Sequence, residues 1–130
     1  MKTGIKTLDL FTRIIAAAIF AYSAYMKIIA SPESIEVFRR IGLEPYGRYG
    51  VAALECIVVV LLIIPKTAWR GAVLGALMMF GAIGMHIMMN EIIVLNDGGL
   101  MFSSAIIVFV CCIGILIMHR TEIEADPYAI

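Results

Sequence analysis

The chain has 130 residues, of which 62% are hydrophobic and only 15% are charged, with a mean hydropathy of +1.00 and a formal net charge of zero. Soluble domains are about 45–50% apolar and about 25% charged, so this composition excludes an ordinary soluble domain and indicates an integral membrane protein. The length suits a single domain, and the zero net charge argues against a nucleic-acid partner.

The first predicted element is a membrane-spanning helix over 10–29, which has the roughly 20 apolar residues needed to cross a bilayer. Because this stretch is long for a signal peptide, we expect a retained helix. The next segment, 32–41, predicts a short amphipathic helix that lies in the membrane interface. Ser31 is a suitable N-cap for it, and Pro32 suits its first position.

Three further apolar stretches follow, and each is long enough to span a membrane. Pro65 ends the first of them, and Gly71 and Gly75 give the next one a spacing that suits close helix packing. The predicted spans are 49–64, 68–89 and 100–118. The sequence therefore predicts an all-α, integral membrane four-helix bundle that forms one domain over 1–130, with the interfacial helix between its first two spans.

The distribution of Lys and Arg in the short loops predicts the orientation of the bundle. With four spans, both termini lie on the same side as the turn at 66–70. That side holds six of the ten basic residues, and the loop at 90–99 on the other side has none. We therefore expect both termini in the cytoplasm and, if the protein is bacterial, a location in the cytoplasmic (inner) membrane.

Polar residues within the spans gather in the leaflet opposite the termini. Glu55 lies about 9 Å inside the non-cytoplasmic end of its helix, and a buried carboxylate must be paired or protonated. Lys27 and His86 lie at a similar depth on other spans and are its candidate partners. The predicted ligand-binding or buried polar cluster comprises Glu55, Lys27, His86, Asn90, Tyr22, Tyr25 and Ser103.

Structural interpretations of these residues remain open. An ion pair at Glu55 could merely fix the register of the helices, Lys27 could extend to the interface, and His86 could be a packing residue. Ser103 could bond to its own helix backbone. Near the cytoplasmic end of the first span, Asp9 and Arg13 are four residues apart and predict a structural ion pair.

Metal and thiol chemistry find little support in the sequence. One embedded histidine excludes bis-histidine haem ligation within one chain, and methionines in a membrane core usually fill gaps rather than bind copper. The cysteines, Cys56, Cys111 and Cys112, form no C-x-x-C motif, so we expect them to be small buried residues. We expect no metal, haem or copper and no cofactor other than a quinone.

Several motifs in order resemble the DoxX-like family of small four-helix membrane proteins, which neighbours the MauE proteins. They are Arg13, "AYMK" at 24–27, "FRRIGLEP" at 38–45, Glu55, "WRGAVLGALMMFGAIGMHI" at 69–87 and "NDGGLMF" at 96–102. The chain departs from the family at Ala24, where glycine is usual, and it lacks the cysteine pair that MauE-like relatives carry near 96–102. The resemblance implies a membrane subunit that in some relatives is associated with oxidoreductases, such as thiosulfate:quinone oxidoreductase, and in others acts as a cargo receptor or assembly helper.

These features together favour an accessory subunit of a membrane redox complex, with a pocket for a quinone or another small apolar ligand in the non-cytoplasmic leaflet. We do not expect a stand-alone enzyme, because the chain has no nucleotide-binding glycine loop, thiol pair or metal-ligand cluster. The expected partners are membrane lipid and either other membrane subunits or further copies of the chain. The alternatives are an assembly factor or scaffold that binds membrane proteins, and an oligomeric transporter of protons, ions or small molecules.

Overall fold

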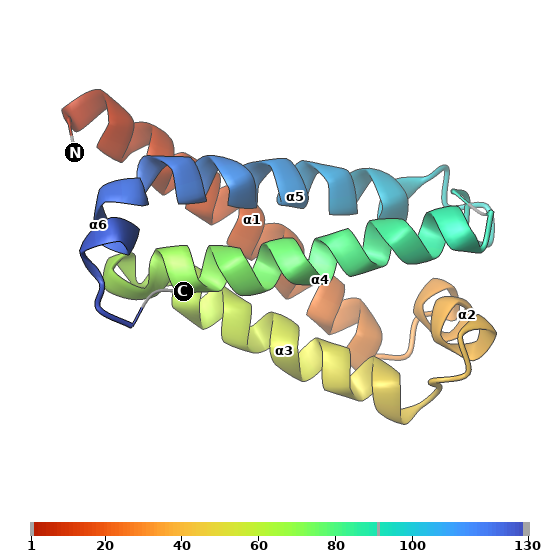
Figure 1. Cartoon of the computed structure of the whole chain (residues 1–130). Helices are drawn as coiled ribbons and strands as arrows, with labels where there is room; N and C mark the ends of the chain where they lie inside the picture. The colour runs from red at the N-terminus through yellow and green to blue at the C-terminus, as the bar shows by residue number, and fades with distance from the viewer. Residues whose placement is uncertain (1, 91, 129–130) are drawn as a thin grey trace.

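A computed structural model describes residues 2–90 and 92–128, and within these residues all regular secondary structure is helical. Four long helices run alternately up and down the bundle, as Figure 1 shows. They are α1 (Thr3–Ile28), α3 (Tyr46–Ile63), α4 (Ala68–Met88) and α5 (Leu100–Met118). The short helices are α2 (Pro32–Arg40), the 3-10 helix η1 (Pro65–Thr67) and α6 (Arg120–Ala125).

The four long helices form a ring in which each packs against two others. α1 contacts α3 and α5, and α4 contacts the same two helices from the opposite side. The buried core lies at the centre of this ring. Its members are Ala16, Ala17, Phe20, Val58, Leu62, Ala72, Ala76, Val108, Cys112 and Ile115.

Two glycines of α4 allow this close packing. A Cβ atom at Gly71 would lie 2.8 Å from Leu61 Cβ and 3.1 Å from the backbone nitrogen of Leu62, so α4 lies directly against the backbone of α3. A Cβ atom at Gly75 would lie 3.0 Å from Cys112 Sγ and 3.1 Å from the Phe20 ring. The glycine spacing noted in the sequence is therefore used for contacts within the chain.

The bundle has the surface of a membrane protein. Three segments are long and apolar enough to cross a membrane, namely Tyr46–Ile63, Pro65–Met88 and Leu100–Met118. α1 meets the criteria of length and hydropathy for a membrane span only when it is taken together with α2. The two helices are joined at an angle of 81°. Because the exposed side chains of these helices are mainly large and apolar, the surface suits lipid rather than water. The predicted all-α membrane bundle is confirmed.

Helix boundaries differ from the prediction mainly at the ends of the chain. α1 begins at Thr3, seven residues before the predicted start, because hydropathy detects only the apolar part of a helix that continues beyond it. α6 follows α5 and was not predicted. The N-cap prediction for α2 is confirmed, since Ser31 Oγ accepts a hydrogen bond from the Ser34 backbone N–H. The prediction of three buried cysteines is confirmed for Cys112, whereas Cys111 is half-buried and Cys56 is exposed on α3.

Candidate functional site

A cavity of about 300 Å³ lies near the end of the bundle that α2 and the α4–α5 loop occupy (Figure 1). We call it the Glu55 cavity. Its apolar walls come from α1, α4 and α5. Its lining residues are Ile19, Phe20, Tyr22, Ser23, Met26, Lys27, Ser31, Glu33, Ser34, Glu55, Met79, Ala82, His86, Asp97, Leu100, Met101, Ser104, Ala105 and Val108.

A buried ion pair forms the polar centre of this cavity. Lys27 Nζ on α1 lies 2.8 Å from Glu55 Oε1 on α3, and the two side chains are only 9% and 1% exposed. Lys27 also donates a hydrogen bond of 2.6 Å to Ser23 Oγ, one helical turn earlier. Two charges withdrawn from solvent in this way stabilise each other only while both are present.

The carboxylate of Glu55 is incompletely satisfied. The Lys27 contact is an ion pair by distance, but neither oxygen of Glu55 accepts a hydrogen bond from any described residue. An ionised carboxylate has about four acceptor positions, and leaving them unused in a buried site costs free energy. A residue that lines the cavity therefore carries unused acceptor positions.

His86 on α4 is buried and forms a second polar part of the wall. Its ring packs edge-on against Phe102 of α5, with 5.7 Å between the ring centroids. This contact orients the imidazole and links α4 to α5 beside the cavity.

Asp97, in the loop before α5, also lines the cavity and organises that loop. Its carboxylate accepts hydrogen bonds from the backbone N–H groups of Val94, Gly99 and Met101, at 3.1, 2.8 and 3.2 Å. Burial by itself raises the pKa of Asp97, but these three donors outweigh it, so the pKa lies below its ordinary value. The loop is therefore held by an ionised carboxylate at the N-terminus of α5, where the helix dipole favours negative charge.

The structure brings together only part of the predicted cluster. Lys27, Glu55, His86 and Tyr22 line the cavity. Three other members of the predicted cluster are exposed and do not line it, namely Tyr25, Asn90 and Ser103.

Other polar lining residues were missed in the sequence. Ser104 lines the cavity because it lies four residues before the buried Val108, a spacing that the sequence itself contains. Ser31, Glu33 and Ser34 come from the start of α2, the helix expected to cap one end of the bundle, but its amphipathic pattern does not indicate which of its residues line the cavity.

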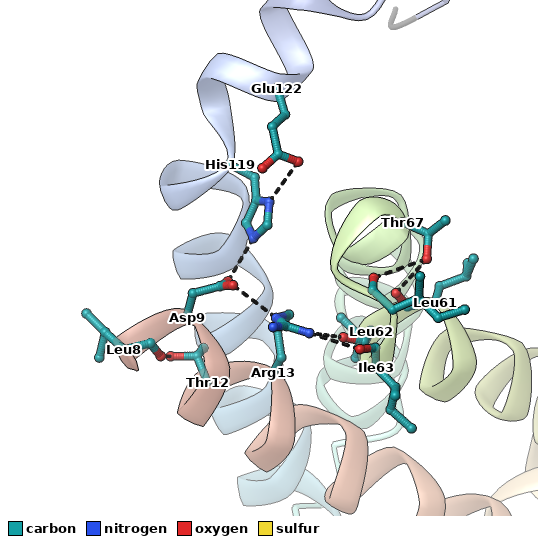
Figure 2. A network of polar contacts seen from close by, with 11 residues as sticks. Leu8, Asp9, Thr12, Arg13, Leu61, Leu62, Ile63, Thr67, His119 and Glu122 are labelled. Carbon is teal, nitrogen blue, oxygen red and sulfur yellow. Dashed lines mark hydrogen bonds and ion pairs between the residues drawn. The ribbon is translucent and has the colours of Figure 1, made fainter. Parts of the chain in front are cut away.

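A second polar cluster lies at the opposite end of the bundle (Figure 2). Arg13 Nε is 3.0 Å from Asp9 Oδ2, which is the ion pair expected from the sequence. Arg13 Nη1 also donates to the backbone oxygens of Leu62, at 2.9 Å, and Ile63, at 3.1 Å. The guanidinium thereby satisfies carbonyl groups that the end of α3 leaves without helical partners.

His119 extends this second cluster to α5 and α6. Its Nε2 lies 2.8 Å from Asp9 Oδ1, and its Nδ1 lies 3.2 Å from Glu122 Oε2. The sequence interpretation missed His119, although it follows the buried Cys112 and Ile115 at helical spacing. The cluster joins α1, α3 and α5 and is a structural connection at that end.

Metal binding has no cluster of donors to support it in the described part of the chain. No group of three or more His, Cys, Asp or Glu side chains there lies close enough together to hold a metal ion.

Comparison with known proteins gives a family but no individual relative. No curated protein and no solved structure matches the chain. The sequence profile of the DoxX-like family matches residues 11–114, which include all four long helices in whole or in large part and every residue that lines the Glu55 cavity. The chain belongs to the DoxX-like family.

Proposed function

We propose that this membrane protein binds a small, mainly apolar molecule with a polar headgroup, of the quinone class, in the Glu55 cavity. The observation that carries the proposal is the buried Lys27–Glu55 pair, whose carboxylate accepts no hydrogen bond from the described residues and which lines a cavity with both apolar and polar walls. Binding sites for small molecules commonly combine apolar walls with a few polar groups that orient the ligand.

The size of the cavity limits the ligand. A volume of about 300 Å³ lies at the lower end of the range for ligand pockets, which is about 300–1,000 Å³. It accommodates one substituted ring, so a long isoprenoid tail would have to extend out of the cavity into lipid. Met26, Met79 and Met101 line the wall, and their flexible side chains suit an adaptable fit.

The biological role we propose is that of an accessory subunit in a membrane redox complex. Other subunits would supply the electron-transfer centres, and this chain would hold the ligand in one leaflet. In this proposal both termini face the cytoplasm, the bundle lies in the inner membrane of a bacterium, and the ligand enters from the opposite leaflet. In this proposal the imidazole of His86, which lines the cavity, is the titratable group that accompanies redox chemistry with proton exchange.

The scaffold and transporter alternatives have no comparable observation in their favour. Gly71 and Gly75, whose spacing suits close helix packing, both contact helices of the chain itself rather than offering a face to a partner protein. For transport, the ion pair of Glu55 lies at one end of the bundle, and the apolar core separates it from the cluster around Asp9.

The test combines ligand analysis with a variant that fills the cavity. The protein is purified in mild detergent with its lipid, and the bound quinones are extracted and identified by mass spectrometry. Ala82→Phe introduces a ring into the cavity, whereas Ala53→Phe places the same ring on the exposed surface of α3. We expect a bound quinone in the wild type and in Ala53→Phe, and its loss in Ala82→Phe.

Both variants must first show wild-type helicity and a single peak in gel filtration. The proposal is rejected if the wild type contains no quinone or quinol and binds neither a short-chain quinone analogue nor its quinol beyond partition into detergent. Equal binding by the two variants would also reject the Glu55 cavity as the site.

A further inference from the structure

We infer that the Glu55 cavity selects ligands whose headgroup carries a hydroxyl group, such as a phenol or a quinol, over analogues that can only accept hydrogen bonds. The inference rests on the proposed function and adds which chemical form binds. It is carried by Glu55 itself, whose side chain is 1% exposed and whose carboxylate oxygens accept no hydrogen bond from the described residues.

Two neighbouring donors at the cavity, Lys27 and Ser31, are already engaged with other groups. Lys27 donates to Ser23 Oγ and pairs with Glu55 Oε1, which leaves Oε2 without a contact of this kind. The hydroxyl of Ser31 donates to Ser34 Oγ at 2.9 Å. A donor on the ligand would fill the open acceptor position at Oε2.

A hydroxyl group matches both charges of the pair. Its hydrogen can be donated to Glu55 Oε2, and its oxygen can accept from the ammonium group of Lys27. A quinone carbonyl or an ether oxygen can accept from Lys27 but offers nothing to the carboxylate. An ammonium headgroup would also donate, but it would place a second positive charge beside Lys27. A neutral hydroxyl is thus the headgroup that suits the site best.

The matched probes are a phenol with a short alkyl tail and the methyl ether of the same phenol. They have nearly the same shape, and neither undergoes quinone reduction, so binding is measured without a redox change. Affinities are measured by calorimetry on the whole chain in lipid nanodiscs, after correction for partition into empty nanodiscs. Since a hydrogen bond to a charged acceptor contributes strongly, we expect the phenol to bind about 10- to 100-fold more tightly.

Glu55→Gln tests whether the carboxylate is the acceptor. The amide has nearly the same shape but no charge, so we expect the preference for the phenol to fall to a few-fold. The control is Glu36→Gln, which removes a carboxylate on α2 that pairs with Arg39 and Arg40 outside the cavity. We expect this variant to keep the full preference.

Infrared difference spectra of the wild type provide a second measurement that needs no variant. The phenol should shift a carboxylate stretching band, and the ether should not. Equal affinity of the two probes, or a preference that Glu55→Gln leaves unchanged, would overturn the inference while the proposed site stands. Failure of both probes to bind would reject the proposed function together with the inference.

Discussion

Replacement of Lys27 by Met is the most direct perturbation of the buried ion pair. The variant keeps a side chain of similar length but removes the charge 2.8 Å from Glu55 Oε1. At that distance, and with an effective dielectric constant of about 20, the Coulomb attraction is about 6 kcal/mol. Because part of it only offsets the desolvation of the two charges, we expect Lys27→Met to lower the free energy of unfolding by about 3–5 kcal/mol.

The double variant Lys27→Met/Glu55→Met distinguishes the ion pair from ordinary packing. It leaves no unpaired charge, so its stability should lie within about 2 kcal/mol of the wild type. The cost of the double variant should therefore be at least about 3 kcal/mol below the sum of the two single costs.

The assay is equilibrium unfolding in mixed micelles, with increasing sodium dodecyl sulfate and helicity followed by circular dichroism. Lys66→Met is the matched control, since Lys66 is exposed in η1, and its effect should stay within about 0.5 kcal/mol. Additive costs in the cycle would refute the reasoning, because they would mean that Lys27 and Glu55 do not depend on each other.

Three other predictions concern helix packing, the second polar cluster and the α4–α5 loop. Gly71→Ala should destabilise the bundle by about 1–3 kcal/mol, because its Cβ would meet α3, whereas Gly81→Ala, with no atom within 4 Å, should be neutral or stabilising by up to about 1 kcal/mol in the same unfolding assay. Arg13→Lys should cost about 1–3 kcal/mol in thermal unfolding, because a lysine can pair with Asp9 but lacks the planar set of donors that also reaches the end of α3; an unchanged melting temperature would contradict this role. The pKa of Asp97 is lower in the folded chain than in the unfolded one, so its contribution is present above the unfolded value of about 3.9 and is lost as the pH falls through the folded value. Amide hydrogen exchange in 92–101, corrected for the intrinsic exchange rate at each pH, should therefore become faster as the pH falls through the folded pKa of Asp97. Asp97→Asn should remove this pH dependence.

Much of the fold could be predicted because a bilayer imposes simple rules on a chain. The ends of α5 match the predicted span at 100–118, and α2 was predicted from its N-cap and its amphipathic pattern. These features depend on residues that are close in sequence. The start of α1 at Thr3 could not be derived in the same way, since the helix continues beyond the apolar stretch that hydropathy detects and its residues 3–8 are exposed.

The residues of the candidate site also divide into those that the sequence could identify and those that depend on how the helices pack. Glu55 and Lys27 could be identified because a charge in an apolar span needs a partner. The choice between Lys27 and His86 as that partner depends on the relative rotation of α1, α3 and α4, which no single span determines. Ser104, rather than Ser103, faces the cavity for the same reason.

The sequence by itself determined the class of protein, its long helices and the charged residues Glu55 and Lys27, because composition, length and the cost of charge in hydrocarbon are properties of local stretches. Only the tertiary structure decided that Glu55 pairs with Lys27, that its carboxylate borders a cavity and that α2 lies over it. It also placed His119 beside Asp9 at the other end of the bundle. These outcomes depend on how helices rotate and approach one another, which close packing of small residues such as Gly71 and Gly75 sets across the whole bundle.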